Sequence, residues 1–445
     1  MKAVIVGAGL AGLAAGHRLR KAGWQVVLLE KSQSVGGRAL SSRQNGYLLE
    51  NGATQISTGY GAYLALVDEL GLRGEIHESS NVIGLLRDGK LHEIDGTRPV
   101  AAIFSGALGW RAKLRMGLAI LDFIALRPPI DPLDVSASHR LDVESAHGYC
   151  MRRLSREIHD VLVDPAVRCY VLNRADKVSA LEWFSFLRNL AGQKMLAMRG
   201  GLSQLPHALA AALEVRLDST GTHVRSTRQG VEVMYQDAQR HSQVLEGDAC
   251  VIATPLPVAA RIVPELQQAL TPLARSLAYN RARLVHLGFH NRPQSRAIGI
   301  LVGAAAHPQI GLIWLEHNKL PAAAPPGHAL ITAYFDESGL DSVQPDTDAR
   351  LAEIALAFVT RLFPELTDSC DLRHVVRWEL GIPNPSPGIY KMVNELKARL
   401  DPDSRIQLAG DYFTCTGQNS AIHWGNNAAD RLIHDGARHA RQPTS

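Results

Sequence analysis

A glycine-rich turn near the N-terminus constrains the fold of this chain more than any other stretch. Lys2 to Val6 is a short apolar run, as expected for a parallel strand that is buried on both faces. Gly7, Gly9 and Gly12 follow with G-x-G-x-x-G spacing, and Leu13 to Lys21 has helical character. In such a turn the first glycine allows the bend, the second lets a pyrophosphate approach, and the third lets helix and strand pack closely. The free N–H groups at the start of the helix would face the phosphates.

A second apolar run strengthens this interpretation. Gln25 to Glu30 reads as a strand that ends in a carboxylate. In dinucleotide-binding units an acidic residue about 20 positions after the glycines binds ribose hydroxyls. A glycine-rich turn alone would be weak evidence, but strand, turn, helix, strand and terminal Glu30 together predict a Rossmann unit. Glu30 favours an unphosphorylated ribose, which leaves NAD and FAD as candidates.

Length and composition set the scale of the molecule. A chain of 445 residues exceeds what one hydrophobic core usually supports, so two domains are expected. The 47 basic and 43 acidic residues form no dense basic block, which argues against nucleic-acid binding. The five cysteines are far apart and include no C-x-x-C pair, which argues against disulfides and structural zinc and favours a reducing cytoplasm. No spacing typical of a metal site is evident.

The chain contains no window of about 20 apolar residues, so no transmembrane span is expected. Gly106 to Pro129 comes nearest, but it contains Arg111, Lys113, Arg115 and Asp122. This segment is predicted to be an amphipathic helix of the substrate domain, with contact to a membrane surface as the alternative.

The segment after Glu30 separates the two cofactors. Gly36, Gly37 and Arg38 resemble the second FAD motif of the flavin amine oxidase superfamily, which includes monoamine oxidases, protoporphyrinogen oxidases and phytoene-type desaturases. The C-terminal stretch from Ile406 to Leu432, with Gly410 followed by an aspartate and a helix, resembles the family's last FAD segment. The resemblance implies that FAD is the cofactor.

Weaker similarities to the same family occur between these two motifs, in the order in which the family has them. The resemblance implies non-covalent FAD, because Ile389 stands where monoamine oxidases carry the cysteine that attaches the flavin. The residues expected to bind FAD are Gly7, Gly9, Leu10, Ala11, Gly12, Glu30, Lys31, Gly36, Gly37, Arg38, Gly52, Ala53, Thr54, Gly221, Thr254, Gly410, Asp411, Ser420 and Ala421.

The order of the motifs predicts an α/β fold with two interleaved parts. A discontinuous Rossmann-type FAD-binding domain would comprise residues 1–75, 200–260 and 390–445. The two insertions, 76–199 and 261–389, would form an α+β substrate domain of a mixed sheet plus helices. Within them we expect a hairpin that turns at Asp88-Gly89 and a helix from Asp346 to Leu362.

Three residues are candidates for roles near the flavin. His286 matches best the position of a lysine that reaches flavin N5 through water in many amine oxidases, and a core histidine is the alternative. Tyr390 could supply one ring of the aromatic pair that flanks an amine substrate, whereas Gly417 stands near the second position. Trp424 would either pack the last helix or form a wall of the substrate pocket.

We therefore expect an FAD-dependent oxidoreductase that takes a hydride from a C–N or C–C unit of a small apolar or aromatic molecule. The looser matches lean toward the protoporphyrinogen-oxidase-like branch, and an amine or amino-acid oxidase is the main alternative. A non-redox flavoenzyme, such as a mutase or isomerase, and an FAD-bound binding protein are further alternatives. The sequence does not predict whether oxygen or another molecule accepts the electrons, nor the oligomeric state.

Overall fold

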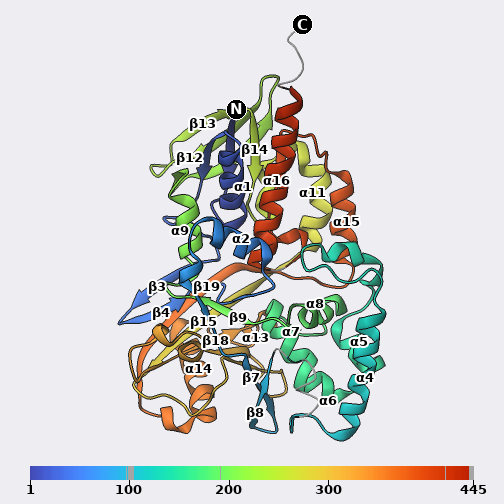
Figure 1. Cartoon of the computed structure of the whole chain (residues 1–445), viewed down its shortest axis with the longest axis vertical. Coiled ribbons are helices and arrows are strands. Elements are labelled where there is room, and N and C mark those ends of the chain that lie inside the picture. The colour runs from blue at the N-terminus through green and yellow to red at the C-terminus, as the bar shows by residue number, and fades with distance from the viewer. Residues whose placement is uncertain (97, 99–104, 191, 416, 440–445) are drawn as a thin grey trace.

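Two sheets, one parallel and one mixed, form the framework of the molecule (Figure 1). The computed structural model describes residues 1–96, 98, 105–190, 192–415 and 417–439. In Figure 1 the upper half holds the parallel sheet with the N-terminal strand and the last helix, and the lower half holds the mixed sheet. The predicted α/β class, with a Rossmann-type part and a mixed-sheet part, is confirmed.

The parallel sheet has five strands in the order β10-β2-β1-β14-β20. Its strands are β1 (Lys2–Val6), β2 (Gln25–Leu29), β10 (Glu214–Arg216), β14 (Ala249–Ile252) and β20 (Ile406–Leu408). Helices α1 (Leu10–Lys21) and α16 (Gln418–His439) pack closely together, because a Cβ added to Gly425 would lie 2.2 Å from the Ala11 carbonyl oxygen. The first and last segments of the chain therefore meet beside one sheet. Nearby lies the antiparallel sheet of β11 (Thr220–Ser226), β12 (Val231–Gln236) and β13 (Ser242–Gly247).

The mixed sheet has seven strands in the order β19-β15-β18-β17-β16-β7-β8. Its strands are β7 (Val82–Arg87), β8 (Lys90–Asp95), β15 (Tyr279–Phe289), β16 (Gly299–Leu301), β17 (Ile310–Leu315), β18 (Ala329–Phe335) and β19 (Cys370–Pro383). β16 pairs in parallel with β7, and the other neighbours are antiparallel. Every residue of β17 and β18 is buried, and α14 (Asp348–Leu362) packs against β15 and β19. The expected Asp88-Gly89 hairpin and the expected helix are both present.

Short elements connect the two sheets. They include the hairpin of β3 (Ser41–Gln44) and β4 (Tyr47–Glu50) and a small sheet of β5 (Ile56–Ser57), β9 (Met195–Met198) and β6 (Ile76–Glu78). The remaining helices named in Figure 1 or below are α2 (Gly61–Glu69), α4 (Trp110–Ala125), α5 (Ala146–Arg153), α6 (Arg156–Ile158), α7 (Asp164–Val171), α8 (Ala180–Leu190), α9 (Gln204–Ala210), α10 (Leu256–Ile262), α11 (Gln267–Ser276), α12 (Glu316–Lys319), α13 (Glu337–Leu340) and α15 (Ile389–Arg399).

All strands of the parallel sheet fall within residues 1–75, 200–260 and 390–445, and all strands of the mixed sheet fall within 76–199 and 261–389. One helix of the second insertion, α11, packs against α10 and α15 and lies in the upper half of Figure 1. The domain boundaries themselves stay a prediction.

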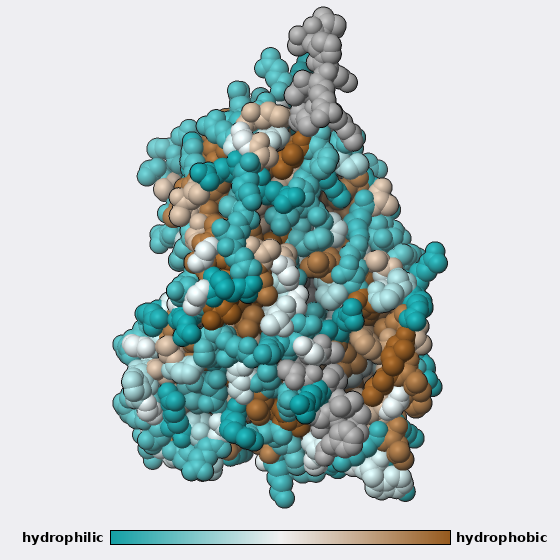
Figure 2. Space-filling view, viewed as in Figure 1, coloured by the Kyte–Doolittle hydropathy of each residue, from teal (hydrophilic) through white to brown (hydrophobic). Residues whose placement is uncertain are grey.

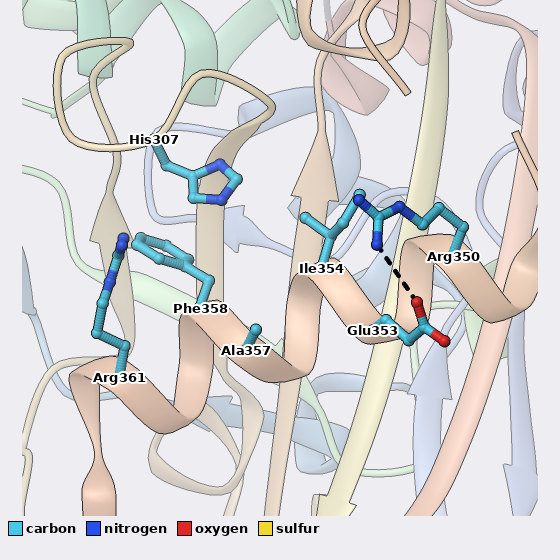
Figure 3. Close-up of a pocket in the computed structure, with 7 residues that line it drawn as sticks. All are labelled: His307, Arg350, Glu353, Ile354, Ala357, Phe358 and Arg361. Carbon is cyan, nitrogen blue, oxygen red and sulfur yellow. Dashed lines mark hydrogen bonds and ion pairs between the residues drawn. The ribbon is translucent and has the colours of Figure 1, made fainter. Parts of the chain in front are cut away.

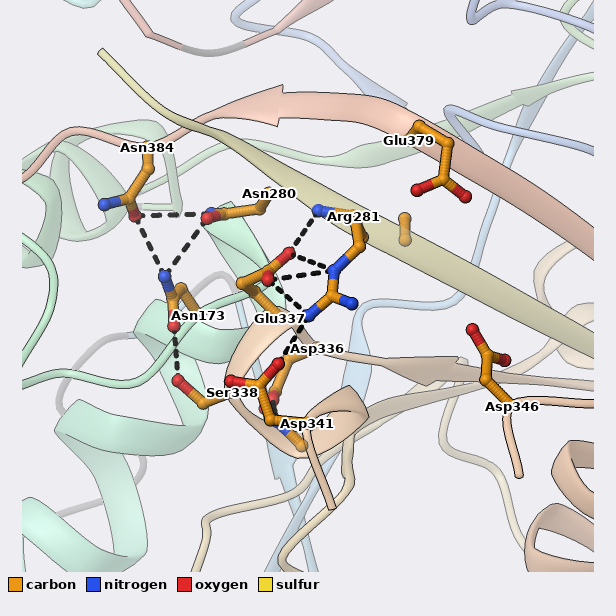
Figure 4. A network of polar contacts seen from close by, with 12 residues as sticks. Asn173, Asn280, Arg281, Asp336, Glu337, Ser338, Asp341, Asp346, Glu379 and Asn384 are labelled. Atoms are coloured by element: carbon orange, nitrogen blue, oxygen red, sulfur yellow. Dashed lines mark hydrogen bonds and ion pairs between the residues drawn. The ribbon is translucent and has the colours of Figure 1, made fainter. Parts of the chain in front are cut away.

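A buried polar network joins α7, β15 and the end of β19 (Figure 4). The Asn173 side-chain amide donates to the Asn280 Oδ1 at 3.1 Å and to the Asn384 Oδ1 at 3.2 Å. Asn280 in turn donates to the Val171 carbonyl at 2.7 Å. Leu172, which lies between Val171 and Asn173, has a φ of +53°, a conformation that is strained for a leucine. Every member of the network has a hydrogen-bond partner. The network can therefore fix the position of β15 and of the end of β19 relative to α7.

Candidate active site

The predicted phosphate-binding turn has the geometry that its glycines require. Gly7 has a φ of +107°, and a Cβ there would lie 2.6 Å from the Ala253 carbonyl oxygen. A Cβ at Gly12 would lie 2.0 Å from the Gly7 carbonyl oxygen. By contrast, no described atom beyond the chain neighbours of Gly9 lies within 4 Å of the position that its Cβ would take. The turn is therefore crowded on its protein side and open at Gly9, where a phosphate would approach.

Glu30 lies buried at the end of β2, next to this turn. Its carboxylate accepts the Ala8 N–H at 2.8 Å and the Ser32 N–H at 2.9 Å. Gly221 comes close as well, because a Cβ there would lie 2.6 Å from the Val6 Cγ1. Glu30 and Gly221 are thus brought to the carboxyl end of the parallel sheet, where nucleotides bind in folds of this class. Lys31 is exposed at its rim.

The second motif lies directly beside the first. The Gly36 N–H donates to the Ala8 carbonyl at 2.8 Å, and a Cβ at Gly37 would lie 3.3 Å from the Gly9 Cα. Both glycines have positive φ, +108° and +57°, which a residue with a side chain adopts only with strain. Gly36 and Gly37 therefore lie directly beside Gly9 and extend the predicted phosphate-binding surface. The backbone around Gly7, Gly9, Gly36 and Gly37 is called the cradle below.

Arg38 connects the N-terminal motifs to the C-terminal one. Its Nη1 lies 2.8 Å from the Asp411 Oδ2, and its Nη2 donates to the Asp411 Oδ1 at 3.1 Å. The same guanidinium donates to the Gly381 carbonyl at 2.7 Å, in β19 of the mixed sheet. A two-bond pair of this kind is among the stronger polar contacts in proteins. The two halves of the predicted FAD site are therefore in contact.

Residues 51–54 contact the backbone of Arg38 and are held by side chains of the mixed-sheet part. The Ala53 N–H donates to the Arg38 carbonyl at 2.9 Å, and a Cβ at Gly52 would lie 2.1 Å from that same oxygen. Three donors bind the carbonyls of this segment: the Trp378 indole at Asn51 (2.7 Å), the Tyr334 hydroxyl at Gly52 (3.1 Å) and the Lys319 ammonium at Thr54 (2.7 Å). The segment is thus fixed from both sides.

Lys319 is a cation in an almost completely buried position. It is 2% exposed, it forms an ion pair with Glu316 in α12, and its Nζ lies 5.6 Å from the centre of the Trp314 ring. The sequence analysis did not single out Lys319, because one lysine in the polar run "EHNK" is typical of a solvated surface. Only the tertiary structure reveals it as a neighbour of the predicted cofactor site.

Glu50 is a second buried acid near this lysine. It accepts hydrogen bonds from the Ser41 hydroxyl at 2.6 Å and from the Leu202 N–H at 3.1 Å. Burial raises the pKa of Glu50 to about 7, although the charge of Lys319 acts in the opposite direction.

This raised pKa predicts a pH-dependent stability. Between the unfolded pKa of 4.5 and the folded pKa of about 7, the folded state holds the Glu50 proton more firmly than the unfolded state does. The free energy of unfolding should therefore fall as the pH rises from 5 to 7, and Glu50→Gln should make this fall shallower. Thermal melts at pH 5, 6 and 7 test it, with the exposed Glu395→Gln as control. Equal slopes for the wild type and E50Q would contradict the assignment.

The polar groups around this cradle fit FAD. Among the described residues, the buried Thr254 Oγ1, Asn51 Oδ1 and Gln55 Nε2 have no hydrogen-bond partner. No described side chain caps α1 at Gly9, so its first N–H groups remain available. Unsatisfied polar groups are costly when buried, and a dinucleotide would satisfy them. Together with Glu30 and the Arg38–Asp411 pair, they could hold the cofactor.

The start of α16 lies beside residue 55, since the Gln418 side-chain amide donates to the Gln55 carbonyl at 3.0 Å. The Ser420 hydroxyl and the Ala421 N–H both donate to the Gly417 carbonyl, at 2.9 and 3.2 Å. Before it, the ring of Tyr412 fills the space next to Gly410, because a Cβ there would lie 2.4 Å from that ring. The N-terminus of a helix favours negative charge, which suits a reduced flavin. Residue 416 lies outside the described residues.

His286 is fully buried in the mixed sheet. Its Nδ1 lies 2.9 Å from the Thr332 hydroxyl, and its ring stacks 6.0 Å from that of His374. Burial, with smaller contributions from the charges of His374 and Lys319, lowers the pKa of His286 to about 3. The imidazole is therefore neutral, and its role near the flavin stays a prediction.

Tyr390 is buried at the start of α15 and is held through its hydroxyl. This hydroxyl donates to the Glu182 carboxyl group and lies 3.2 Å from the Thr414 carbonyl. Burial raises the pKa of Glu182 to about 8, and its second carboxyl oxygen has no partner among the described residues. Sequence reasoning missed Glu182, because one acid in an aromatic helix gives no distinguishing pattern.

Trp424 contacts both the FAD-binding part and the first insertion. Its ring stacks 4.4 Å from Phe413, and its indole N–H donates to the Leu133 carbonyl at 3.2 Å. These contacts agree with the helix-packing alternative, and a role in the substrate pocket stays a prediction.

A surface hollow of about 350 Å³ lies along α14 (Figure 3). Its wall includes Arg350, Glu353, Phe358 and Arg361 together with His307. His307 is occupied with the chain itself, since its Nδ1 accepts the N–H groups of Gln309 and Ile310. The hollow contains none of the predicted site residues.

Comparison with known proteins gives a consistent result. The family described as flavin containing amine oxidoreductase matches residues 10–433. The chain is 22% identical to coproporphyrinogen III oxidase of Bacillus subtilis (strain 168), over 97% of each chain. It is 30% identical to putrescine oxidase of Kocuria rosea, over 51% of this chain and 48% of that protein. Cyclohexylamine oxidase from Brevibacterium oxydans IH-35A shares the fold, with a TM-score of 0.76, 18% identity, and coverage of 98% of this chain and 99% of that one.

The family match spans nearly the whole chain, and the site holds the two halves of the FAD motif in contact. The predictions of FAD, of an oxidoreductase and of the superfamily are therefore confirmed. The chain belongs to the flavin-containing amine oxidoreductase family and is an FAD-dependent oxidoreductase.

Proposed function

We propose that the substrate is a largely apolar molecule of the porphyrinogen type, from which a hydride is taken at a C–N or C–C unit. The observation that carries the proposal is the position of Tyr390. Its hydroxyl is bound to Glu182 and Thr414, and its ring is fully buried, so it is poorly suited to form half of an amine cage. The position expected for the other ring is Gly417. Similarity to a coproporphyrinogen III oxidase over 97% of both chains supports the same branch.

The residues of the site would orient and protect the reaction. FAD, when bound, supplies the acceptor for the hydride. Arg38 and Asp411 would hold the cofactor between the two parts, and residues 51–54 would form a rigid floor. Buried tyrosines near this floor, such as Tyr334, would keep water from the reacting bond. The neutral His286 and Trp424 remain candidates for contact with the cofactor or the substrate.

Anaerobic reduction tests the proposal directly. The FAD-loaded chain would be mixed, without oxygen, with coproporphyrinogen III, protoporphyrinogen IX, putrescine, cyclohexylamine and a set of amino acids. Loss of the flavin absorbance with a porphyrinogen alone would support the proposal. Fast bleaching by an amine or amino acid, with none by the porphyrinogens, would contradict it and favour the amine-oxidase branch. Hydrogen peroxide after admission of air would identify oxygen as an electron acceptor.

A membrane surface is a proposed partner. Among the described residues, no helix is both long and apolar enough to cross a membrane. However, α4 exposes Trp110, Leu114, Leu121 and Ile124, each at least 61% accessible, and Figure 2 shows apolar side chains gathered over this helix. Arg111 is one of several exposed cations next to this face. We propose that α4 rests on an anionic membrane surface.

We also propose that the protein works in a reducing compartment such as the cytoplasm. The five cysteines, which are all free, support this proposal.

A paired substitution would measure the contact of α4 with the membrane. Leu114→Glu together with Leu121→Glu should reduce binding to vesicles of phosphatidylglycerol at least tenfold, because two charges would enter the lipid interface. Co-sedimentation with vesicles measures the bound fraction, and Leu217→Glu, a change at an exposed leucine elsewhere, serves as control. Equal binding of the wild type and the paired variant would contradict the proposal.

A further inference from the structure

Three polar side chains meet at one end of the mixed sheet, and none of them is a predicted FAD-binding residue. His290 directly follows β15, His328 directly precedes β18, and Asp371 lies near the start of β19. Because β15 lies between β18 and β19, with Phe289 opposite Ala329, these strand ends come together. His290, His328 and Asp371 are therefore neighbours in space although they lie far apart in the sequence. Their spacing in the sequence matches no metal-binding motif.

The distances between these side chains suit a metal ion better than hydrogen bonds. The His290 Nδ1 lies 3.5 Å and the His328 Nδ1 lies 3.4 Å from the same oxygen, Asp371 Oδ2. Both separations exceed the 2.7–3.2 Å of a normal N–H···O hydrogen bond. In a tetrahedral zinc site with bonds of about 2.1 Å, neighbouring ligand atoms lie about 3.4 Å apart. All three potential ligand atoms lie within 4.8 Å of one another.

A buried tyrosine orients the carboxylate. The Tyr47 hydroxyl, at the start of β4, lies 2.8 and 2.9 Å from the two oxygens of Asp371. A Cβ at Gly288 would lie 2.7 Å from both Asp371 and Tyr47, so a glycine there makes room for their contact. Tyr47 also lies 2.9 Å from the His328 Nδ1. When His328 directs its lone pair to an ion, the hydroxyl can donate to Asp371 alone, as outer-shell partners of metal ligands commonly do.

We propose that His290, His328 and Asp371 form a site for a divalent transition metal of the zinc type. Two imidazoles and one carboxylate are a donor set that suits zinc and disfavours magnesium and calcium, which prefer oxygen. The side chain of His290 is 63% exposed, so water could complete the coordination. The ion would link three strand ends to the β3–β4 hairpin and thereby stabilise this edge of the sheet. The site is independent of the proposed substrate.

Calorimetry with zinc chloride tests the proposal on the full-length, FAD-loaded chain after treatment with EDTA. We expect one zinc ion per chain, no binding of magnesium chloride, and a rise in the melting temperature with zinc. His290→Ala should weaken zinc binding at least tenfold and remove the rise in melting temperature. Because His290 is exposed, this variant should keep its fold and its flavin, which the visible spectrum checks.

The matched control is His241→Ala, since His241 is an exposed histidine with a single carboxylate, Asp237, 4.0 Å away. H241A should bind zinc as the wild type does. His328→Gln provides a second test within the cluster and should also weaken binding at least tenfold. Zinc binding that is equal in the wild type, H290A and H328Q, or no zinc binding by the wild type, would overturn the proposal.

Discussion

Arg38→Ala is expected to yield a chain that folds but no longer retains FAD. The guanidinium makes two contacts with Asp411 and one with the Gly381 carbonyl, so it joins three segments that surround the cradle. Its removal leaves the Asp411 carboxylate, 11% exposed, without its cation beside the expected path of the cofactor. An uncompensated carboxylate beside the anionic cofactor, with the two-bond contact of this partly buried pair gone, should cost about 3 kcal/mol of FAD binding, or roughly a 100-fold loss of affinity. Flavin absorbance after gel filtration, and titration of the apoprotein with FAD, measure the effect.

Two further variants test whether the two-bond contact between Arg38 and Asp411 is the reason for the expected loss of FAD. Arg38→Lys keeps the charge but cannot form the two-bond contact, so its affinity for FAD should lie between those of the wild type and R38A. Arg73→Ala removes an exposed ion pair with Asp68 and should leave FAD binding unchanged. If R38A retained FAD with wild-type affinity, the contact between the two motifs would hold the protein together but not the cofactor.

The FAD-binding part of the fold could be predicted from the sequence because it depends on backbone conformations that single residues determine. Gly7 and Gly12 are needed where a side chain would collide with backbone less than 3 Å away, so their spacing is visible in the sequence. The hairpin at Asp88-Gly89 depends equally on its own turn residues. By contrast, the order of the seven-stranded sheet depends on which strands bury one another, which no local pattern specifies.

The substrate side of the site could not be predicted for the same reason. Lys319, Tyr334 and Trp378 bind three of the four carbonyls of residues 51–54, yet they come from separate elements of the mixed-sheet part. A lysine in a polar run and scattered aromatic residues have no distinctive spacing. Glu182 likewise acquires its raised pKa from burial, which is a property of the tertiary structure.

The second large effect is expected at Lys319. Lys319→Met removes the only partner that the Glu316 carboxylate, 1% exposed, has among the described residues, and it removes the donor to the Thr54 carbonyl. Leaving a buried charge unpaired costs on the order of 3–5 kcal/mol. The free energy of unfolding should fall by about this amount, and denaturant titration measures it. An unchanged stability of K319M would contradict the buried ion pair.

A double variant separates this stability effect from a role in the active site. Lys319→Met combined with Glu316→Gln replaces the ion pair with neutral groups of similar size, so most of the lost stability should return. The Thr54 carbonyl would still lack its donor, however, and residues 51–54 would be held less firmly beneath the cofactor. We therefore expect the anaerobic reduction of the flavin to stay at least tenfold slower than in the wild type, because small displacements at a reacting centre are costly. If stability and reduction rate recovered together, Lys319 would serve only the packing of α12 and would not position the floor of the active site.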